Sequence, residues 1–188
     1  MSTLPIKNMV CNRCKQVVQQ ELEQLGVTVK SVDMGKAVIA DDKPDLPTIA
    51  SALEERGFEL IGSQEDEKAE EIKNAIIQFV HASDTAVSAL TFSHYLEEKL
   101  KTDYHTLSAL FSRTERVTIQ QYHILQRIER AKELLTYGEL SIGQIADQLN
   151  YRNTAHLSAQ FKKVTGTTPS QYKRLKNQQR KPLDKILY

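Results

Sequence analysis

Apolar residues recur along this chain in two rhythms, one over about the first third and another over the remainder. In residues 1–62, short strand-like runs alternate with two amphipathic stripes at helical spacing. Strands are expected around residues 4–10, 27–32, 36–40 and 58–61, and helices around residues 13–25 and 46–56. From Ile72 onward the pattern keeps the helical period and indicates no strand.

The first rhythm corresponds to the order βαββαβ, which is that of a ferredoxin-like unit. Capping residues mark the starts of helices in the remainder: Thr118 with Gln121, Ser141 with Gln144, Asp103, and Asn153. They predict helices over residues 119–137, 142–150, 104–114 and 154–165. We therefore expect an α+β fold, with a ferredoxin-like βαββαβ domain followed by an all-α domain.

Composition places the boundary between these parts near residue 62. The stretch GSQEDEKAEE is polar and acidic, which is typical of a linker. The predicted organisation is a first domain over residues 1–62, an acidic linker over 63–71, a helical domain over 72–175 and a basic tail over 176–188. The tail is expected to contact phosphates or to fold back onto the helical domain.

The helical domain contains two pairs of helices joined by short turns. In the second pair, residues 150–153 form the turn, and Leu157, Phe161 and Val164 are expected to bury one face of the following helix. This is the plan of a helix-turn-helix unit, whose second helix enters the major groove of DNA. The first pair repeats the design, because YHTLSALFSR and TAHLSAQFKK both contain Leu-Ser-Ala-x-Phe at the same place.

The faces opposite these apolar residues carry small or hydrogen-bonding side chains, which allow a helix backbone to approach base edges closely. In the first unit the outward residues are His105, Ser108, Ala109 and Ser112. In the second they are Thr154, Ala155, Ser158 and Ala159, with Lys162 and Lys163 where phosphates would lie. These ten residues are the predicted DNA contacts.

The distribution of charge supports an anionic partner for the helical half. Lys and Arg number 7 in residues 1–62, 3 in 63–100 and 15 in 101–188, against 9, 8 and 7 Asp and Glu. The net charges are therefore −2, −5 and +8, although the whole chain carries only +1. A basic half suits double-stranded DNA.

Residues 127–169 carry a long motif that ends in SIGQIADQLNYRNTAHLSAQFKKVTGTTP. With the preceding RIERAKELL, this stretch resembles the signature of the AraC/XylS family of transcription regulators. The resemblance covers about residues 72–175. It implies a seven-helix domain whose two recognition helices enter successive major grooves, about 34 Å apart. It also implies base contacts early on each recognition helix and RNA polymerase as a partner. Asn150 stands where many members have Gly, and Asn tolerates the positive φ that this turn requires.

The two cysteines, Cys11 and Cys14, form one C-x-x-C at the start of the first predicted helix. A helix N-terminus stabilises thiolates, so the pKa of both thiols is expected to be lowered. Two thiolates three residues apart can bind a soft ion such as Cu(I), with Met9 as an apolar shield or weak ligand.

In its βαββαβ context, NMVCNRC resembles the M-x-C-x-x-C loop of heavy-metal-associated domains such as those of copper chaperones. Asn8 replaces the usual Gly, and Val10 the usual Thr. The resemblance implies Cu(I) or another soft metal bound by Cys11 and Cys14, and a metal donor protein as a partner. Two alternatives remain open for this domain: a metal-free interaction module and a thioredoxin-like redox role.

Several classes of protein are disfavoured. The histidines lack the spacing of zinc enzymes, and neither a phosphate-binding glycine loop nor a G-x-S-x-G motif occurs, so we expect no enzyme. No apolar run is long enough for a membrane span, and no secretory signal is recognisable, which predicts a cytoplasmic protein. The leading hypothesis is a DNA-binding transcription regulator that senses a soft metal. Its rivals are a regulator with a metal-free first domain and a metal-trafficking protein with a helical docking domain.

Overall fold

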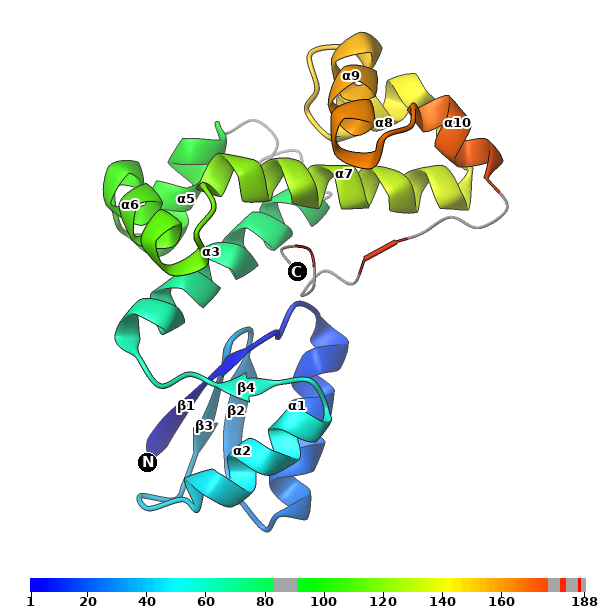
Figure 1. Cartoon of the computed structure of the whole chain (residues 1–188). Coiled ribbons are helices and arrows are strands. Elements are labelled where there is room, and N and C mark those ends of the chain that lie inside the picture. The colour runs from blue at the N-terminus through cyan, green and yellow to red at the C-terminus, as the bar shows by residue number, and fades with distance from the viewer. Residues whose placement is uncertain (83–90, 176–179, 182–185, 187–188) are drawn as a thin grey trace. The chain divides into compact units, whose positions relative to one another are not determined.

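The computed structural model describes residues 1–82, 91–175, 180–181 and 186 (Figure 1). The chain divides into two compact units: unit 1 comprises Met1–Ala75 and Leu100–Arg116, and unit 2 comprises Ile76–Lys99 and Val117–Tyr188. The division therefore passes through a helix and differs from the boundary expected near residue 62. No helix of the described part is long and apolar enough to cross a membrane.

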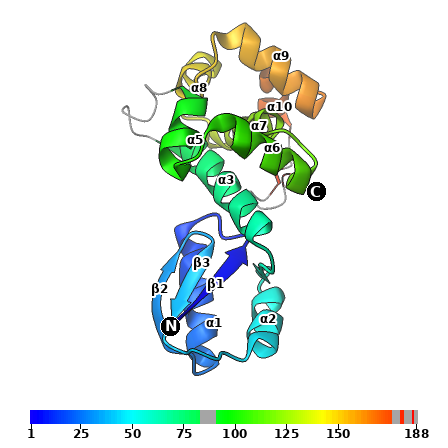
Figure 2. The same cartoon turned by 90° about the vertical axis from the view of Figure 1, so that its left-hand side faces the viewer.

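Unit 1 begins with a four-stranded antiparallel sheet and two helices in the predicted order βαββαβ. The elements are β1 (Ser2–Lys7), α1 (Asn12–Gln24), β2 (Val29–Asp33), β3 (Lys36–Ile39), α2 (Leu46–Glu55) and β4 (Glu59–Leu60). The strands lie in the order β2-β3-β1-β4, with Leu4 opposite Ala37 and Ile6 opposite Leu60. Both helices cover one face of this sheet, as the two views show (Figure 2).

The alternation of buried and less buried side chains along β1 explains how the sheet contributes to a hydrophobic core. Leu4 and Ile6 are buried, and they pack with Val18 and Leu22 of α1 and with Leu53 of α2. This follows from the two periods, because every second residue of a strand and every third or fourth of a helix shares a face.

Two of the strands were predicted to extend too far, β1 and β4. β1 ends at Lys7 rather than Val10, because Asn8 has a φ of 70° and leaves the extended conformation. β4 is limited to Glu59–Leu60, whereas Phe58 packs in the core beside the helices.

Residues 64–71, predicted as part of a linker, are instead the first turns of helix α3 (Gln64–His81). The Ser63 hydroxyl accepts a hydrogen bond from the Asp66 amide at 3.1 Å. The acidic residues of the first turn favour the positive end of the helix dipole. A polar, acidic stretch is thus a helix start here, and the buried face of α3 already begins at Ala69.

The remaining helices are α5 (Phe92–Leu100), α6 (Tyr104–Glu115), α7 (Ile119–Tyr137), α8 (Ile142–Gln148), α9 (Thr154–Thr165) and α10 (Pro169–Arg174). The predicted bounds of α7 and α9 are confirmed, as are the capping boxes before α7 and α8. Sequence reasoning missed α10, although Thr168 and Gln171 form a capping box of the same kind.

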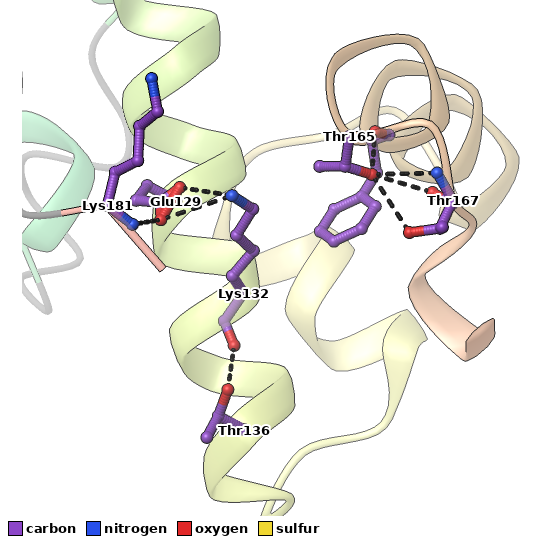
Figure 3. A network of polar contacts seen from close by, with 7 residues as sticks. Glu129, Lys132, Thr136, Thr165, Thr167 and Lys181 are labelled. Atoms are coloured by element: carbon purple, nitrogen blue, oxygen red, sulfur yellow. Dashed lines mark hydrogen bonds and ion pairs between the residues drawn. The ribbon is translucent and has the colours of Figure 1, made fainter. Parts of the chain in front are cut away.

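In unit 2, α7 is the helix on which α8, α9 and α10 pack (Figure 1). Ile128, Ala131 and Leu135 of α7 are buried in one cluster with residues of these three helices. Glu129 of α7 is also buried, and it accepts hydrogen bonds from the Lys132 ammonium and from the backbone amide of Lys181 (Figure 3). The predicted return of the basic tail to the helical domain is therefore seen at Lys181, whereas 176–179, 182–185, 187 and 188 lie outside the described residues.

An aromatic cluster near the start of α7 contains a histidine, His123, that is held neutral. The His123 ring stacks on Phe92, with centroids 3.8 Å apart, and meets the Phe79 ring edge-on at 5.7 Å. Its buried Nε2 has no hydrogen-bond partner among the described residues. Burial, and then the nearby charge of Arg127, lower the pKa of His123 to about 3.

We predict that acid destabilises this cluster well above pH 3. The unfolded chain protonates His123 near its ordinary pKa of 6.5, whereas the folded chain does so only near 3. The free energy of unfolding should therefore fall by roughly 2 kcal/mol through this residue between pH 7 and pH 5. Urea unfolding at both pH values measures it, and His123→Phe should lose that part of the pH dependence. The same loss of stability in both proteins would contradict the assignment.

Candidate nucleic-acid interface and cysteine pair

Local capping interactions decide where α9 begins. α8 starts at the capping box of Ser141 and Gln144, and the turn after it passes through Asn150, whose φ is 54°. The Asn153 side chain then accepts a hydrogen bond from the His156 amide at 2.8 Å, which caps α9. The expectation that Asn150 supplies the positive φ of this turn is confirmed.

Burial of one face decides how α9 is oriented. Leu157 and Phe161 are 1% and 0% exposed, and the Phe161 ring meets the Tyr172 ring of α10 edge-on at 5.5 Å. Tyr151 in the turn is covered by Arg127 of α7, whose guanidinium carbon lies 3.6 Å from the ring centroid. Val164 does not share this buried face as predicted, because it is 38% exposed.

The opposite face of α9 is available to a partner. Thr154, Ala155, Ala159, Lys162 and Lys163 are exposed and Ser158 is half-buried. The face thus has a narrow arc of small side chains followed by two cations, which suits the close approach of a helix to base edges beside phosphates. His156 lies off this arc, with its ring against Tyr151 at 5.3 Å.

The end of α9 is closed by hydrogen bonds of a single hydroxyl. Thr165 Oγ1 donates to the carbonyl of Phe161 at 2.8 Å and also lies 3.0 Å from the carbonyl of Thr167 (Figure 3). Gly166 then takes a φ of 80° as the C-cap. After this turn α10 ends in Lys173 and Arg174, exposed cations that sequence reasoning did not assign to the interface. The capping box before α10 was the signal that could have found them.

In unit 1, α6 repeats the design of α9. Asp103 caps it through the Thr106 amide at 2.9 Å, and hydrogen bonds from Thr106 lower the pKa of the Asp103 carboxyl. Leu107 and Phe111 are 1% and 0% exposed. His105 and Ala109 are exposed, and Ser108 and Ser112 are half-buried, so the four predicted contact residues share the accessible side of α6.

The cysteine pair lies at the N-terminus of α1. Cys11 is the N-cap residue and is exposed, Cys14 is half-buried in the first turn, and their sulfurs are 3.2 Å apart without a disulfide. Met9 is fully buried in the cluster against which Cys14 packs, so it serves as apolar packing rather than as an accessible ligand.

The prediction that both thiols have a lowered pKa is wrong for Cys14. Burial and then a hydrogen bond with the Cys11 thiol raise the pKa of Cys14, and these outweigh hydrogen bonds from backbone amides that lower it. The helix N-terminus is a weaker influence here than desolvation, because the sulfur of Cys14 faces the apolar core.

The donor set of the pair suits a soft monovalent ion. Two sulfurs within 3.2 Å of each other, one of them on an exposed side chain that can rotate, can reach one ion together. Within the described residues, no group of three or more His, Cys, Asp or Glu side chains could hold a metal ion.

Comparison with known proteins finds a family model that matches the helical half. Residues 84–175 match the family model of a helix-turn-helix domain. Over 93 residues the chain is 32% identical to the melibiose operon regulatory protein of Escherichia coli K12. This match covers 49% of this chain and 30% of that protein. Over 62 residues it is 39% identical to the transcriptional activator RhaR of Salmonella arizonae, covering 33% of this chain and 22% of that protein.

A solved structure agrees with these matches. The C-terminal domain of AraT, a response regulator from Geobacillus stearothermophilus, is 28% identical with a TM-score of 0.50, covering 60% of this chain and 88% of that one. The chain spans less than a third of the length of the curated relatives named above. The residues that match the family model, 84–175, all lie in the helical half.

We predict that the two thiols differ in reactivity. Cys11 is exposed, whereas the pKa of Cys14 is raised by burial, so iodoacetamide at neutral pH should alkylate Cys11 first. Mass spectrometry of Cys11→Ser and Cys14→Ser, each with one remaining thiol, measures both rates between pH 6 and pH 10. Equal rates at every pH would contradict the assignment.

Proposed function

We propose that this protein, whose residues 84–175 match a helix-turn-helix domain, is a DNA-binding transcription regulator of the AraC type that recognises specific sequences. The observation that carries the proposal is the pair of equivalent helices, α6 and α9. Each buries a Leu and a Phe four residues apart and exposes a Ser-Ala face between them. The contact residues are the ten predicted from the sequence, and RNA polymerase is the expected protein partner.

The chemistry of these faces indicates how recognition works. Short side chains let the helix backbone come close to base edges, and Ala or Thr methyl groups can contact the thymine methyl. Because few long side chains are present, part of the specificity is expected from the shape and deformability of the duplex. Lys162 and Lys163 hold the register by contacting phosphates.

For the first domain we propose a ferredoxin-like fold of the heavy-metal-associated type that binds Cu(I) through Cys11 and Cys14. The βαββαβ order, the sheet order and the position of the pair at the start of α1 support this. Cu(I) would supply a centre that prefers two thiolate ligands. The chain itself contributes an exposed Cys11 that can be loaded first and a half-buried Cys14 behind it.

A metal-free interaction module is the second candidate. The raised pKa of Cys14 favours it, because a protonated thiol is a poor ligand and must lose its proton on metal binding. A metal-trafficking protein with a helical docking domain is the third, and binding of the full chain to DNA with a steep salt dependence would exclude it.

We predict that a carboxylate on the exposed face of α9 weakens recognition. Ala159→Glu should weaken binding of the full chain to its selected duplex by roughly 1–3 kcal/mol, because it places a negative charge against a base edge. Fluorescence anisotropy with duplexes selected from a random pool measures the affinity. Ser51→Glu makes the same charge change on the exposed side of α2 and is the control. If both variants bind as the wild type does, α9 is not a recognition helix.

We predict that the full chain binds one Cu(I) and that Cys11→Ser/Cys14→Ser does not. Titration against a competing Cu(I) chelator measures the affinity, with Ag(I) and Zn²⁺ as comparisons. Zn²⁺ should bind much more weakly, because Zn²⁺ prefers four ligands and the cysteine pair offers only two sulfurs. Equal binding by both proteins would leave the metal-free module as the function of this domain.

A further inference from the structure

The segment that precedes the cysteine pair is attached to helix α3 by a partly buried hydrogen bond. The backbone amide of Asn8 donates to Glu70 Oε1 at 2.9 Å, and the Asn8 side chain donates to the carbonyl of Gly57 at 2.9 Å. Glu70 is only 3% exposed. Asn8 has a φ of 70°, so the chain leaves the direction of β1 at the residue whose backbone amide donates to α3.

α3 is also seated closely on the sheet at this end. A Cβ atom on Gly35, in the turn between β2 and β3, would lie 3.2 Å from the Asn74 side chain. Asn74 and Glu70 are four residues apart and therefore share one face of α3. The middle of α3 thus lies close to the turn and is bonded to Asn8.

From Glu70, charged side chains with little exposure to water continue to α6. Glu70 Oε2 lies 2.7 Å from the Lys73 ammonium, which lies 3.1 Å from Glu115 Oε1 at the end of α6. The Lys73 and Glu115 side chains are 12% and 10% exposed. Burial alone would lower the pKa of Lys73, but the two carboxylates outweigh it and raise this pKa, so Lys73 stays charged.

We infer that Glu70, Lys73 and Glu115 form a relay that couples the cysteine segment to the recognition helix α6. Lys73 is shared between two carboxylates that have little access to water. If Asn8 moves, Glu70 must find another donor, and Lys73 is the nearest cation. A stronger ion pair between Lys73 and Glu70 weakens the ion pair between Lys73 and Glu115. The end of α6 then loses a fixed contact with α3.

A second ion pair joins the same two helices and serves as a matched comparison. Arg113 Nη2 of α6 lies 2.8 Å from Glu65 Oε1 of α3, and both side chains are about 60% exposed. Exposed pairs contribute little and are screened by salt, whereas desolvated ones respond strongly to the loss of one partner. Among the described residues, no hydrogen bond or ion pair joins the Glu65–Arg113 pair to Asn8.

This inference rests on the proposed DNA binding and predicts its regulation. In the wild type, one equivalent of Cu(I) should change the affinity for the selected duplex by about fivefold or more. The variant Glu70→Gln/Lys73→Met/Glu115→Gln removes all three charges together, so that no charge is left buried alone. It should bind Cu(I) and DNA, but its DNA affinity should be the same with and without Cu(I). Glu65→Gln/Arg113→Gln should keep the wild-type response.

A second measurement is independent of DNA and of metal. In ¹⁵N-labelled protein, alkylating Cys11 with iodoacetamide should shift the backbone amide signals of Asn8 and Glu115 in the wild type. In the neutral triple variant the shift at Glu115 should vanish. Circular dichroism and thermal unfolding establish first that each variant is folded.

The outcomes separate the two ideas. If no duplex is bound, the proposed function fails, and the amide signals still decide on the relay. If Cu(I) leaves the wild-type affinity unchanged, metal regulation fails, and Cys11 alkylation again tests the coupling. The relay is overturned if Glu115 does not respond to Cys11 in the wild type. It is also overturned if the neutral triple variant responds as fully as the wild type.

Discussion

The burial of a Leu and a Phe, four residues apart, is the constraint on which each proposed recognition helix depends. Leu107 with Phe111 and Leu157 with Phe161 are almost completely removed from water. Burying such side chains contributes on the order of 1.5–3 kcal/mol each, far more than any preference of the small residues between them. The orientation of α6 and α9 is therefore set by their apolar sides, and the Ser-Ala faces are exposed as a consequence.

This constraint also shows why the proposed contact surface could be recognised from the sequence. A residue's side of a helix follows from its distance to Leu and Phe along a period of 3.6 residues. All ten predicted contact residues are exposed or half-buried in the structure. Val164 lies seven residues after Leu157 and so on the same side of α9, but it is 38% exposed, because periodicity gives the side of a helix and not how far the neighbouring elements cover it.

The cysteine pair illustrates the opposite situation. Its place at the start of α1 could be read from the sequence, and that position alone argued for stabilised thiolates. The structure adds that Cys14 packs against a core that includes Met9. Desolvation then dominates, and the pKa of Cys14 is raised rather than lowered. Whether a sulfur faces solvent or core depends on elements from β1 to α2, which no local motif describes.

Sequence by itself determined the βαββαβ order, the helical second half, most helix starts and the faces of α6 and α9. These follow from caps and from periodicity, which act between residues at most four apart. Only the tertiary structure decided that residues 64–71 begin α3, that Lys73 joins Glu70 to Glu115, and that Asn8 contacts α3. Asn8 and Glu70 are 62 positions apart, and the charge of each residue says nothing about its partner. Contacts at such separations exist only after the core has brought the elements together.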